Sequence, residues 1–272
     1  MGIEGLWRFL RKNGHEAVIS PQIPGISSSS TTADLTSLPV PTIRVDVLAT
    51  FYSCIRRIYT THPLHVAHEA LEQQILTSGI AQNSVLYLDG PSPDEKRKTF
   101  ESREQRRGHN LKRAQESVAY LAESVKERRR VRKRQFVKLN KHIRAAFYWS
   151  LDSRKAFAQY MQSVGWSIVE CSSEADIAIA HACQPDDIVV STDSDMLAYD
   201  TIRTIWRPIS RGKFLIYDLA SVLQCLGFSR VHLTALCVVS KNDYNCNLAR
   251  MGVLTNYRII KSLKESGKVV IS

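Results

Sequence analysis

Seven acidic residues stand where this chain is expected to end a strand or begin a helix: Asp46, Asp89, Glu174, Asp176, Asp193, Asp195 and Asp243. Each of them lies beside an apolar run, and four of them fall within 22 residues. Several carboxylates should therefore converge at the edge of a buried sheet. Because like charges repel strongly where the dielectric constant is low, a fold that gathers carboxylates in this way commonly holds divalent cations among them.

The order of the apolar runs indicates the class of fold. Strands are predicted at residues 42–47, 84–90, 166–171 and 187–191, and a hairpin at 202–206 and 214–217. Helices are predicted at residues 3–10, 48–60, 63–77, 152–164 and 173–183. Strands that alternate with helices favour a parallel α/β sheet with right-handed crossovers. Ligands bind such sheets beyond the carboxyl ends of the strands, which is where Asp46, Asp89 and Asp193 fall.

Two segments differ from this pattern. Residues 20–42 are rich in Ser, Thr and Pro, which predicts a flexible insertion. Residues 94–146 hold 18 Lys and Arg against 7 Asp and Glu, and this excess equals the net charge of +11 of the whole chain. The segment should form exposed helices, because it is highly charged and contains little Gly or Pro. Its localised positive charge is typical of a contact with nucleic acid or an anionic membrane.

Composition also limits where the protein should act. No apolar run reaches the roughly 20 residues that span a bilayer, and charges interrupt the apolar pattern of the N-terminus. We therefore expect neither a membrane segment nor a secretory signal. The six cysteines form no C-x-x-C pair, which favours free thiols over a zinc site or disulfides. An intracellular protein is expected, and a nuclear one if its substrate is DNA.

Six short motifs occur in the order and approximate spacing of one known family. They are Met1-Gly-Ile-Glu-Gly-Leu, Val45-Asp46, Leu88-Asp89-Gly90 followed by Lys96 and Arg103, Ser173-Glu174-Ala175-Asp176, Asp193-Ser-Asp195 and Asn242-Asp243-Tyr244. From residue 1 to about 262 the chain resembles the flap endonuclease/XPG family of structure-specific 5′ nucleases. Each motif alone is weak, but six in the correct order make the resemblance specific.

The resemblance implies an α/β fold of the PIN-like, 5′-3′ exonuclease type. Its parts would be a central, mostly parallel sheet, a helical arch at about 94–146 and C-terminal helices of the helix-hairpin-helix kind. Residues 1–240 would then form the nuclease domain, and residues 241–272 would begin the helix-hairpin-helix region. The longer C-terminal tail of the family is missing, so the chain would be either a fragment or a short, divergent member.

The activity implied by the resemblance is divalent-metal-dependent hydrolysis of phosphodiester bonds in DNA, at 5′ flaps or other single-/double-strand junctions, in repair or replication. Two Mg²⁺ ions, replaceable by Mn²⁺, would activate water and stabilise the leaving oxygen. The metal site would comprise all seven acids, with Asp46 and Asp243 as outer partners. The catalytic residues would be Asp89, Asp193, Asp195, Lys96 and Arg103. The alternative for Glu174 and Asp193 is that each caps a helix.

A further set of residues is implied to contact DNA: Gly2, Tyr52, Lys96, Arg103, Arg128, Arg129, Arg130, Arg132, Lys133 and Arg134. Tyr52 would stack on a base, unless it is a core aromatic like its neighbour Phe51. The basic block at 126–134 fits the second half of the arch, but a nuclear localisation signal or a solvated helix are alternatives. Lys96 and Arg103, seven residues apart, could likewise lie on a solvated helix face.

Some positions depart from the family pattern. Lys241 precedes Asn242 and Asp243 where a Gly usually occurs, and could bring a cation near the acids. Arg250 replaces the first Gly of the hairpin, which puts duplex binding by that element in doubt. An inactive, nucleic-acid-binding scaffold with a PIN-like fold is therefore the main alternative, and a ribonuclease of the broader PIN group is another. His62, His65 and His68 are expected to lie at the surface or to be partly buried rather than to bind a metal, and His181 is expected to pack within its helix. We expect a monomer without membrane contact that works with repair or replication proteins, in the nucleus or also in mitochondria.

Overall fold

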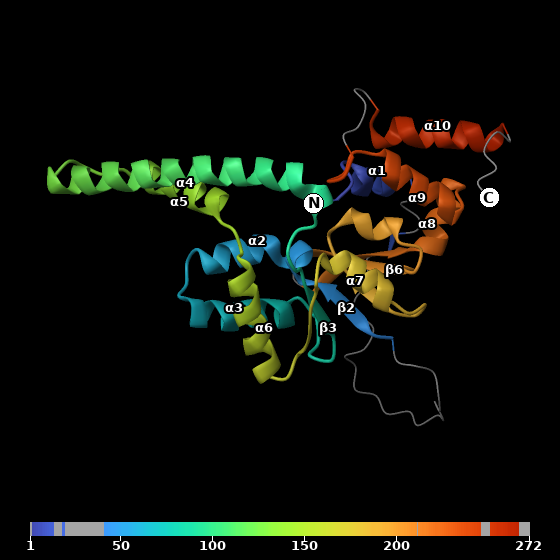
Figure 1. Cartoon of the computed structure of the whole chain (residues 1–272), viewed down its shortest axis with the longest axis horizontal. Coiled ribbons are helices and arrows are strands. Elements are labelled where there is room, and N and C mark those ends of the chain that lie inside the picture. Colours follow the sequence, from blue (N-terminus) through green and yellow to red (C-terminus); the bar gives the residue numbers. More distant parts are fainter. Residues whose placement is uncertain (1, 14–17, 20–40, 211, 246–250, 267–272) are drawn as a thin grey trace.

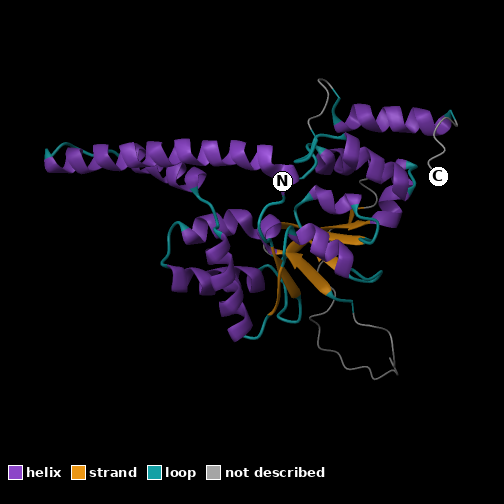
Figure 2. Cartoon of the chain, viewed as in Figure 1, coloured by secondary structure: helices purple, strands orange, loops and turns teal. Residues whose placement is uncertain are grey.

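The computed structural model describes residues 2–13, 18–19, 41–210, 212–245 and 251–266. Its centre is a seven-stranded sheet with the order β1-β7-β6-β5-β2-β3-β4 (Figures 1 and 2). The strands are β1 Val18–Ile19, β2 Ile43–Asp46, β3 Val85–Leu88, β4 Ser167–Glu170, β5 Ile188–Val190, β6 Thr204–Ser210 and β7 Lys213–Asp218. The five strands from β6 to β4 are parallel, and β7 and β1 add an antiparallel edge. The predicted mostly parallel α/β sheet is confirmed.

Helices cover both faces of the sheet. One core packs the sheet against α2 Val47–Tyr59, α3 Leu64–Thr77 and α6 Leu151–Ser163. The other core joins it to α1 Leu6–Asn13, α7 Ala175–Ala182, α8 Leu219–Leu226, α9 Arg230–Val239 and α10 Val253–Glu265. The alternation of side chains along β3 follows from this arrangement, because Leu86 and Leu88 enter the first core and Tyr87 enters the second. Strands buried on both faces are expected to be apolar throughout, as β3 and β5 are.

The basic segment forms a helical hairpin that projects from the body of the molecule (Figure 1). It consists of the short 3₁₀ helix η2 Asp94–Lys96, the long helix α4 Arg97–Lys126 and the helix α5 Lys133–Ala146. Within α4 only Ala114, Leu121 and Ser124 are buried. The exposed helices expected for this segment are therefore present. The basic block lies mostly in the turn between α4 and α5. The alternative of a solvated helix therefore applies only to the residues at the two ends of the block.

The remaining differences from the sequence prediction are small. Strand β1 was not predicted, and residues 20–40 of the expected insertion lie outside the described residues. Pro63 is the N-cap of α3 rather than a residue of its first turn, and α1 begins at Leu6. Residues 246–250, which include Arg250, also lie outside the described part, so the hairpin between α9 and α10 stays a prediction, as does the boundary at residue 240.

No single helix of the described residues is long and apolar enough to cross a membrane, although α8 and α9 together, bent by 83°, have the required length and composition.

Candidate active site

Three aspartates follow three neighbouring parallel strands at the same edge of the sheet. Asp46 is the last residue of β2, Asp89 comes directly after β3, and Asp193 follows β5. Strands β3 and β5 flank β2 on its two sides. The chain runs from β2 outward to β3 and β4 and then crosses back to β5, so the strand order reverses beside β2. Such a point is where open parallel sheets bind ligands. Local sequence thus fixes each Asp at a strand end, and the topology brings the three ends together.

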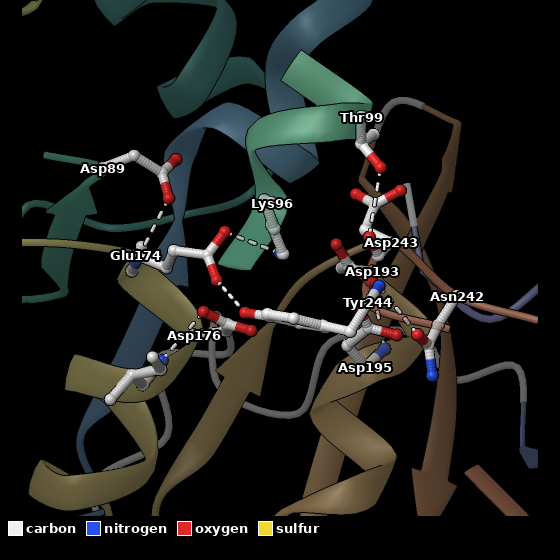
Figure 3. A network of polar contacts seen from close by, with 12 residues as sticks. Asp89, Lys96, Thr99, Glu174, Asp176, Asp193, Asp195, Asn242, Asp243 and Tyr244 are labelled. Atoms are coloured by element: carbon white, nitrogen blue, oxygen red, sulfur yellow. Dashed lines mark hydrogen bonds and ion pairs between the residues drawn. The ribbon is translucent and has the colours of Figure 1, made fainter. Parts of the chain in front are cut away.

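The other four acids come from helices that reach the same edge. Glu174 is the N-cap of α7 and Asp176 lies in its first turn. Asp195 belongs to the 3₁₀ helix η3 Ser194–Ala198, and Asp243 follows α9. A direct link joins two of the segments, because the backbone N–H of Ala175 donates to Asp89 Oδ1 at 2.9 Å. Figure 3 shows six of the seven acids grouped around Lys96.

Lys96 and Arg103 both face these acids. Lys96 Nζ lies 2.6 Å from Glu174 Oε1 and 4.4 Å from the centroid of the Tyr244 ring (Figure 3). Arg103 Nη2 lies 2.8 Å from Asp243 Oδ1 and 2.9 Å from Oδ2. Because the two residues are two helical turns apart, both cations point toward the sheet edge. Lys96 does not lie on a solvated helix face, since its side chain is only 11% exposed.

Helix capping accounts for some of the acids but not for others. Asp46 Oδ1 accepts from Ala49 N–H at 3.0 Å and Oδ2 accepts from the Ser191 hydroxyl at 3.1 Å. Asp193 caps η3 by accepting from Asp195 N–H at 3.0 Å. Glu174 makes no capping bond with its side chain. The capping alternative thus holds for Asp193 and fails for Glu174.

Burial and mutual repulsion make the carboxylates costly to keep charged. Burial is the largest cause that raises the pKa of Asp46, Asp89, Asp176 and Asp193 above the ordinary value. Burial, followed by the charge of Asp193, raises the pKa of Asp195 to about 7. Burial opposes the charge of Lys96, but the hydrogen bond and charge of Glu174 outweigh it and raise the pKa of Lys96. The site therefore favours additional positive charge.

The carboxylates do not form a ready ligand cage. As the side chains stand, no three His, Cys, Asp or Glu residues of the described segments are placed to hold one ion together. Glu174 is engaged by Lys96 and also accepts from the Tyr244 hydroxyl. Asp195 Oδ1, in contrast, is buried and has no hydrogen-bond partner. Rotation of a few carboxylates would be needed for several of them to share a cation.

The N-terminal segment packs directly on the loop that carries Asp193 and Asp195. Ile3 N–H donates to the Ser194 hydroxyl at 2.7 Å, and the Trp7 indole donates to the Thr192 carbonyl at 2.8 Å. Gly2 has a φ of +91°, and a Cβ at this position would lie 2.3 Å from Asp193 Oδ1. A cavity of about 410 Å³ lies between this segment, Arg103 and Asp243. Gly2 thus lies beside Asp193, and its contact with DNA stays a prediction.

We expect Gly2→Ala to damage the site more than the matched change Gly5→Ala. Both glycines have positive φ, which costs a side chain about 1 kcal/mol or more. Only Gly2 also lacks room for a Cβ, because a Cβ added at Gly5 would have no atom within 4 Å. Thermal unfolding of the two variants should show the larger drop in unfolding temperature for Gly2→Ala. Equal drops would mean that the contact with Asp193 contributes nothing.

The other predicted DNA-binding residues lie away from the acids or on the surface. Phe51 is the core aromatic at 4% exposure, while Tyr52 is 36% exposed, with the Arg56 guanidinium 5.7 Å from its ring centroid. The basic block lies at the far end of α4, which at 30 residues is about 45 Å long. Base stacking by Tyr52 and strand binding by the block therefore stay predictions.

Several contacts at the site were not foreseen from sequence. Arg154 of α6 is buried and donates to the carbonyls of Asp89 at 2.5 Å and Gly90 at 3.0 Å, so it braces the Asp89 loop. The Tyr199 hydroxyl donates to Asp176 Oδ2 at 2.9 Å. A single basic or aromatic residue inside an ordinary helix or turn gives no sequence signal for such roles. Tyr244 directly follows Asp243 and could have been suspected from that position.

Two expectations about other side chains can be compared with the structure. Lys241 Nζ lies 2.7 Å from Oε2 of Glu4, an exposed carboxylate that is not one of the seven acids. His68 is buried, and its ring packs near Tyr59, Phe157 and Tyr160. Burial lowers its pKa. His68 is therefore more deeply buried than the surface or partly buried position expected from sequence.

Sequence comparisons identify related proteins. No family model matches the chain. It is 25% identical over 277 residues to flap endonuclease 1-A of Physcomitrium patens and 25% identical over 296 residues to flap endonuclease 1 of Cryptosporidium muris. These alignments cover 96% and 99% of the chain, which spans 64% and 57% of the two relatives. The chain is thus shorter than the curated relatives that it matches.

Structural comparisons agree with the sequence comparisons. The catalytic core of Rad2 in complex with a DNA substrate aligns with 97% of this chain and 68% of that chain, at a TM-score of 0.60 and 15% identity. Human GEN1 in complex with Holliday junction DNA aligns with 97% of this chain and 56% of that one, at a TM-score of 0.54 and 16% identity. At these identities the likeness establishes the PIN-like α/β fold. The chain is thus similar in sequence to flap endonucleases over nearly its whole length, and it shares the α/β fold of Rad2 and GEN1.

Proposed function

We propose that the protein is a divalent-metal-dependent nuclease that hydrolyses phosphodiester bonds of DNA at single-/double-strand junctions such as 5′ flaps. The observation that carries this proposal is the gathering of acids from five chain segments at one sheet edge, next to two cations of the helical hairpin. Similarity to flap endonucleases, and to structures of Rad2 with a DNA substrate and of GEN1 with Holliday junction DNA, supports DNA as the substrate.

The donor set fits Mg²⁺ or Mn²⁺, which are hard cations that prefer carboxylate oxygens and retain water. The unpartnered buried Oδ1 of Asp195 and the repulsion between Asp193 and Asp195 also favour a cation. The nearest ligands would be Asp89, Glu174, Asp176, Asp193 and Asp195, with two ions in the site. Asp46, whose two oxygens are already hydrogen-bonded, and Asp243, which is paired with Arg103, suit outer positions. When bound, the ions would supply an activated water and offset charge on the phosphate.

The cations of the hairpin would act on the substrate itself. Lys96 and Arg103 lie beside the acids, so a phosphate drawn to the ions would meet an ammonium and a guanidinium as well. These groups would offset the charge that develops on the phosphate oxygens. Tyr52 would stack on a base, and the basic block at the tip of the hairpin would attract the single strand by counterion release. A role in nuclear DNA repair or replication is part of the same proposal.

The experiment that tests this function is a cleavage assay on 5′-flap, bubble and nicked duplex DNA in Mg²⁺, with EDTA as the control. Metal-dependent cuts near the junction are expected. A non-catalytic scaffold would instead bind these DNAs without cutting them in either Mg²⁺ or Mn²⁺. Cleavage of single-stranded RNA in preference to the DNA junctions would favour the ribonuclease alternative.

Metal binding should also stabilise the folded protein. Saturating Mn²⁺, at about 100 times its Kd, contributes about 2.7 kcal/mol, which raises the unfolding temperature of a chain of this size by about 5–10 °C. The double variant Asp193→Asn/Asp195→Asn removes the repulsion and the ligands together. It should unfold at a higher temperature than the wild type in EDTA and gain little from Mn²⁺. Differential scanning calorimetry of both proteins measures these effects, and an equal Mn²⁺ shift in both would contradict the assignment.

A further inference from the structure

Two tyrosines hold the two carboxylates of helix α7. The Tyr199 hydroxyl, just after η3, donates to Asp176 Oδ2 at 2.9 Å. The Tyr244 hydroxyl, in the loop after α9, donates to Glu174 Oε2 (Figure 3). The two donors come from separate parts of the chain, yet each reaches one acid of the same helical turn. The Tyr199 ring also packs against the core that contains α7, but neither core packing nor helix capping requires a hydroxyl on each of these two carboxylates.

Both hydroxyls are suited to act as neutral donors. A tyrosine hydroxyl has an ordinary pKa of about 10, so near neutral pH it carries a proton that it can donate to a carboxylate. A carboxylate oxygen has two lone pairs, so it can accept from a tyrosine and still ligate a cation with the other. The hydroxyl would then fix the direction in which the carboxylate presents that second lone pair.

We propose that Tyr199 and Tyr244 are positioning residues that orient Asp176 and Glu174 toward the divalent cations of the site. This inference rests on the proposed metal-dependent function. Hydrogen bonds from such outer groups orient ligating carboxylates, and their loss typically costs about 10–100-fold in metal affinity. Tyr244 has a second role toward Lys96, whose Nζ lies 4.4 Å from the ring centroid. A phenylalanine keeps that ring, so Tyr244→Phe removes only the hydroxyl.

The test measures Mn²⁺ binding to the full chain without DNA, by isothermal titration calorimetry, for the wild type, Tyr199→Phe and Tyr244→Phe. The matched control is Tyr160→Phe, since the Tyr160 hydroxyl donates to Glu72 Oε2 at 2.7 Å in the core beside α3 and α6. That variant loses the same kind of hydrogen bond outside the site. Each site variant should raise the Kd for Mn²⁺ about tenfold, whereas the control should leave it unchanged.

The unfolding temperature in EDTA separates positioning from a general structural role. A structural role would lower this temperature in both site variants and in the control, without a specific change in Mn²⁺ affinity. Unchanged or tighter Mn²⁺ binding by Tyr199→Phe and Tyr244→Phe would overturn the inference and leave the nuclease proposal intact. If the wild type itself bound no Mn²⁺ and cut no DNA, the proposed function and this inference would fall together.

Discussion

Asp195→Asn should lower the single-turnover rate of flap cleavage by about 10³-fold while leaving DNA binding nearly unchanged. Asn keeps the volume of Asp and can accept a hydrogen bond, so the fold should persist. It removes the charge that would attract the cation, and metal-ion catalysis is worth several kcal/mol of transition-state stabilisation, of which about 4 kcal/mol corresponds to 10³-fold. Asp195 is the strongest choice because its buried Oδ1 has no protein partner to lose.

The matched control is Asp186→Asn, which removes an exposed carboxylate from the loop before β5. Its cleavage rate should equal that of the wild type. DNA binding is measured for all three proteins by fluorescence anisotropy in Ca²⁺, so that affinity and chemistry are separated. A variant Asp195→Asn that cut at more than a tenth of the wild-type rate would remove Asp195 from the catalytic group. Loss of binding in parallel with cutting would instead assign it a role in holding DNA.

The positions of the acids could be predicted from sequence because they depend on local pattern. A short run of strand-forming residues that ends at Asp46 or Asp89 predicts a strand with a carboxylate at its end. Alternation with helices then predicts parallel strands, whose ends share one edge. The direction of Lys96 and Arg103 was also predictable, because residues seven apart lie on one helical face.

The contacts between segments could not be predicted in this way. Arg154 reaches the carbonyls of Asp89 and Gly90 across 64 or more residues of sequence, and Tyr199 reaches Asp176 from the turn after η3. Each depends on how helices pack on the sheet, which no periodicity encodes. Strand β1 was missed for a related reason, since two residues are too few to show an alternating pattern. The orientation of the carboxylates likewise depends on contacts between segments and could not be predicted from sequence.

The double variant Lys96→Ala/Arg103→Ala should slow cleavage by at least about 10²-fold, the effect of removing one preorganised donor to developing charge. DNA binding should weaken far less. The reason is position: Lys96 and Arg103 lie against Glu174 and Asp243 at the sheet edge, where a scissile phosphate would sit. The many other cations of the hairpin would still attract the backbone of the DNA.

A control variant can remove an equal number of positive charges, two, from the solvent-exposed side of the same hairpin. Arg97 pairs with Glu101 on the surface, its side chain 77% exposed, and Lys98 is also exposed. The control variant Arg97→Ala/Lys98→Ala has the same net charge as Lys96→Ala/Arg103→Ala, so it should lose as much nonspecific attraction to DNA but keep its cleavage rate. Equal rates for the two double variants would show that only total charge matters. If the Lys96/Arg103 variant lost binding in proportion to its rate, the two residues would be phosphate holders rather than groups that stabilise the transition state.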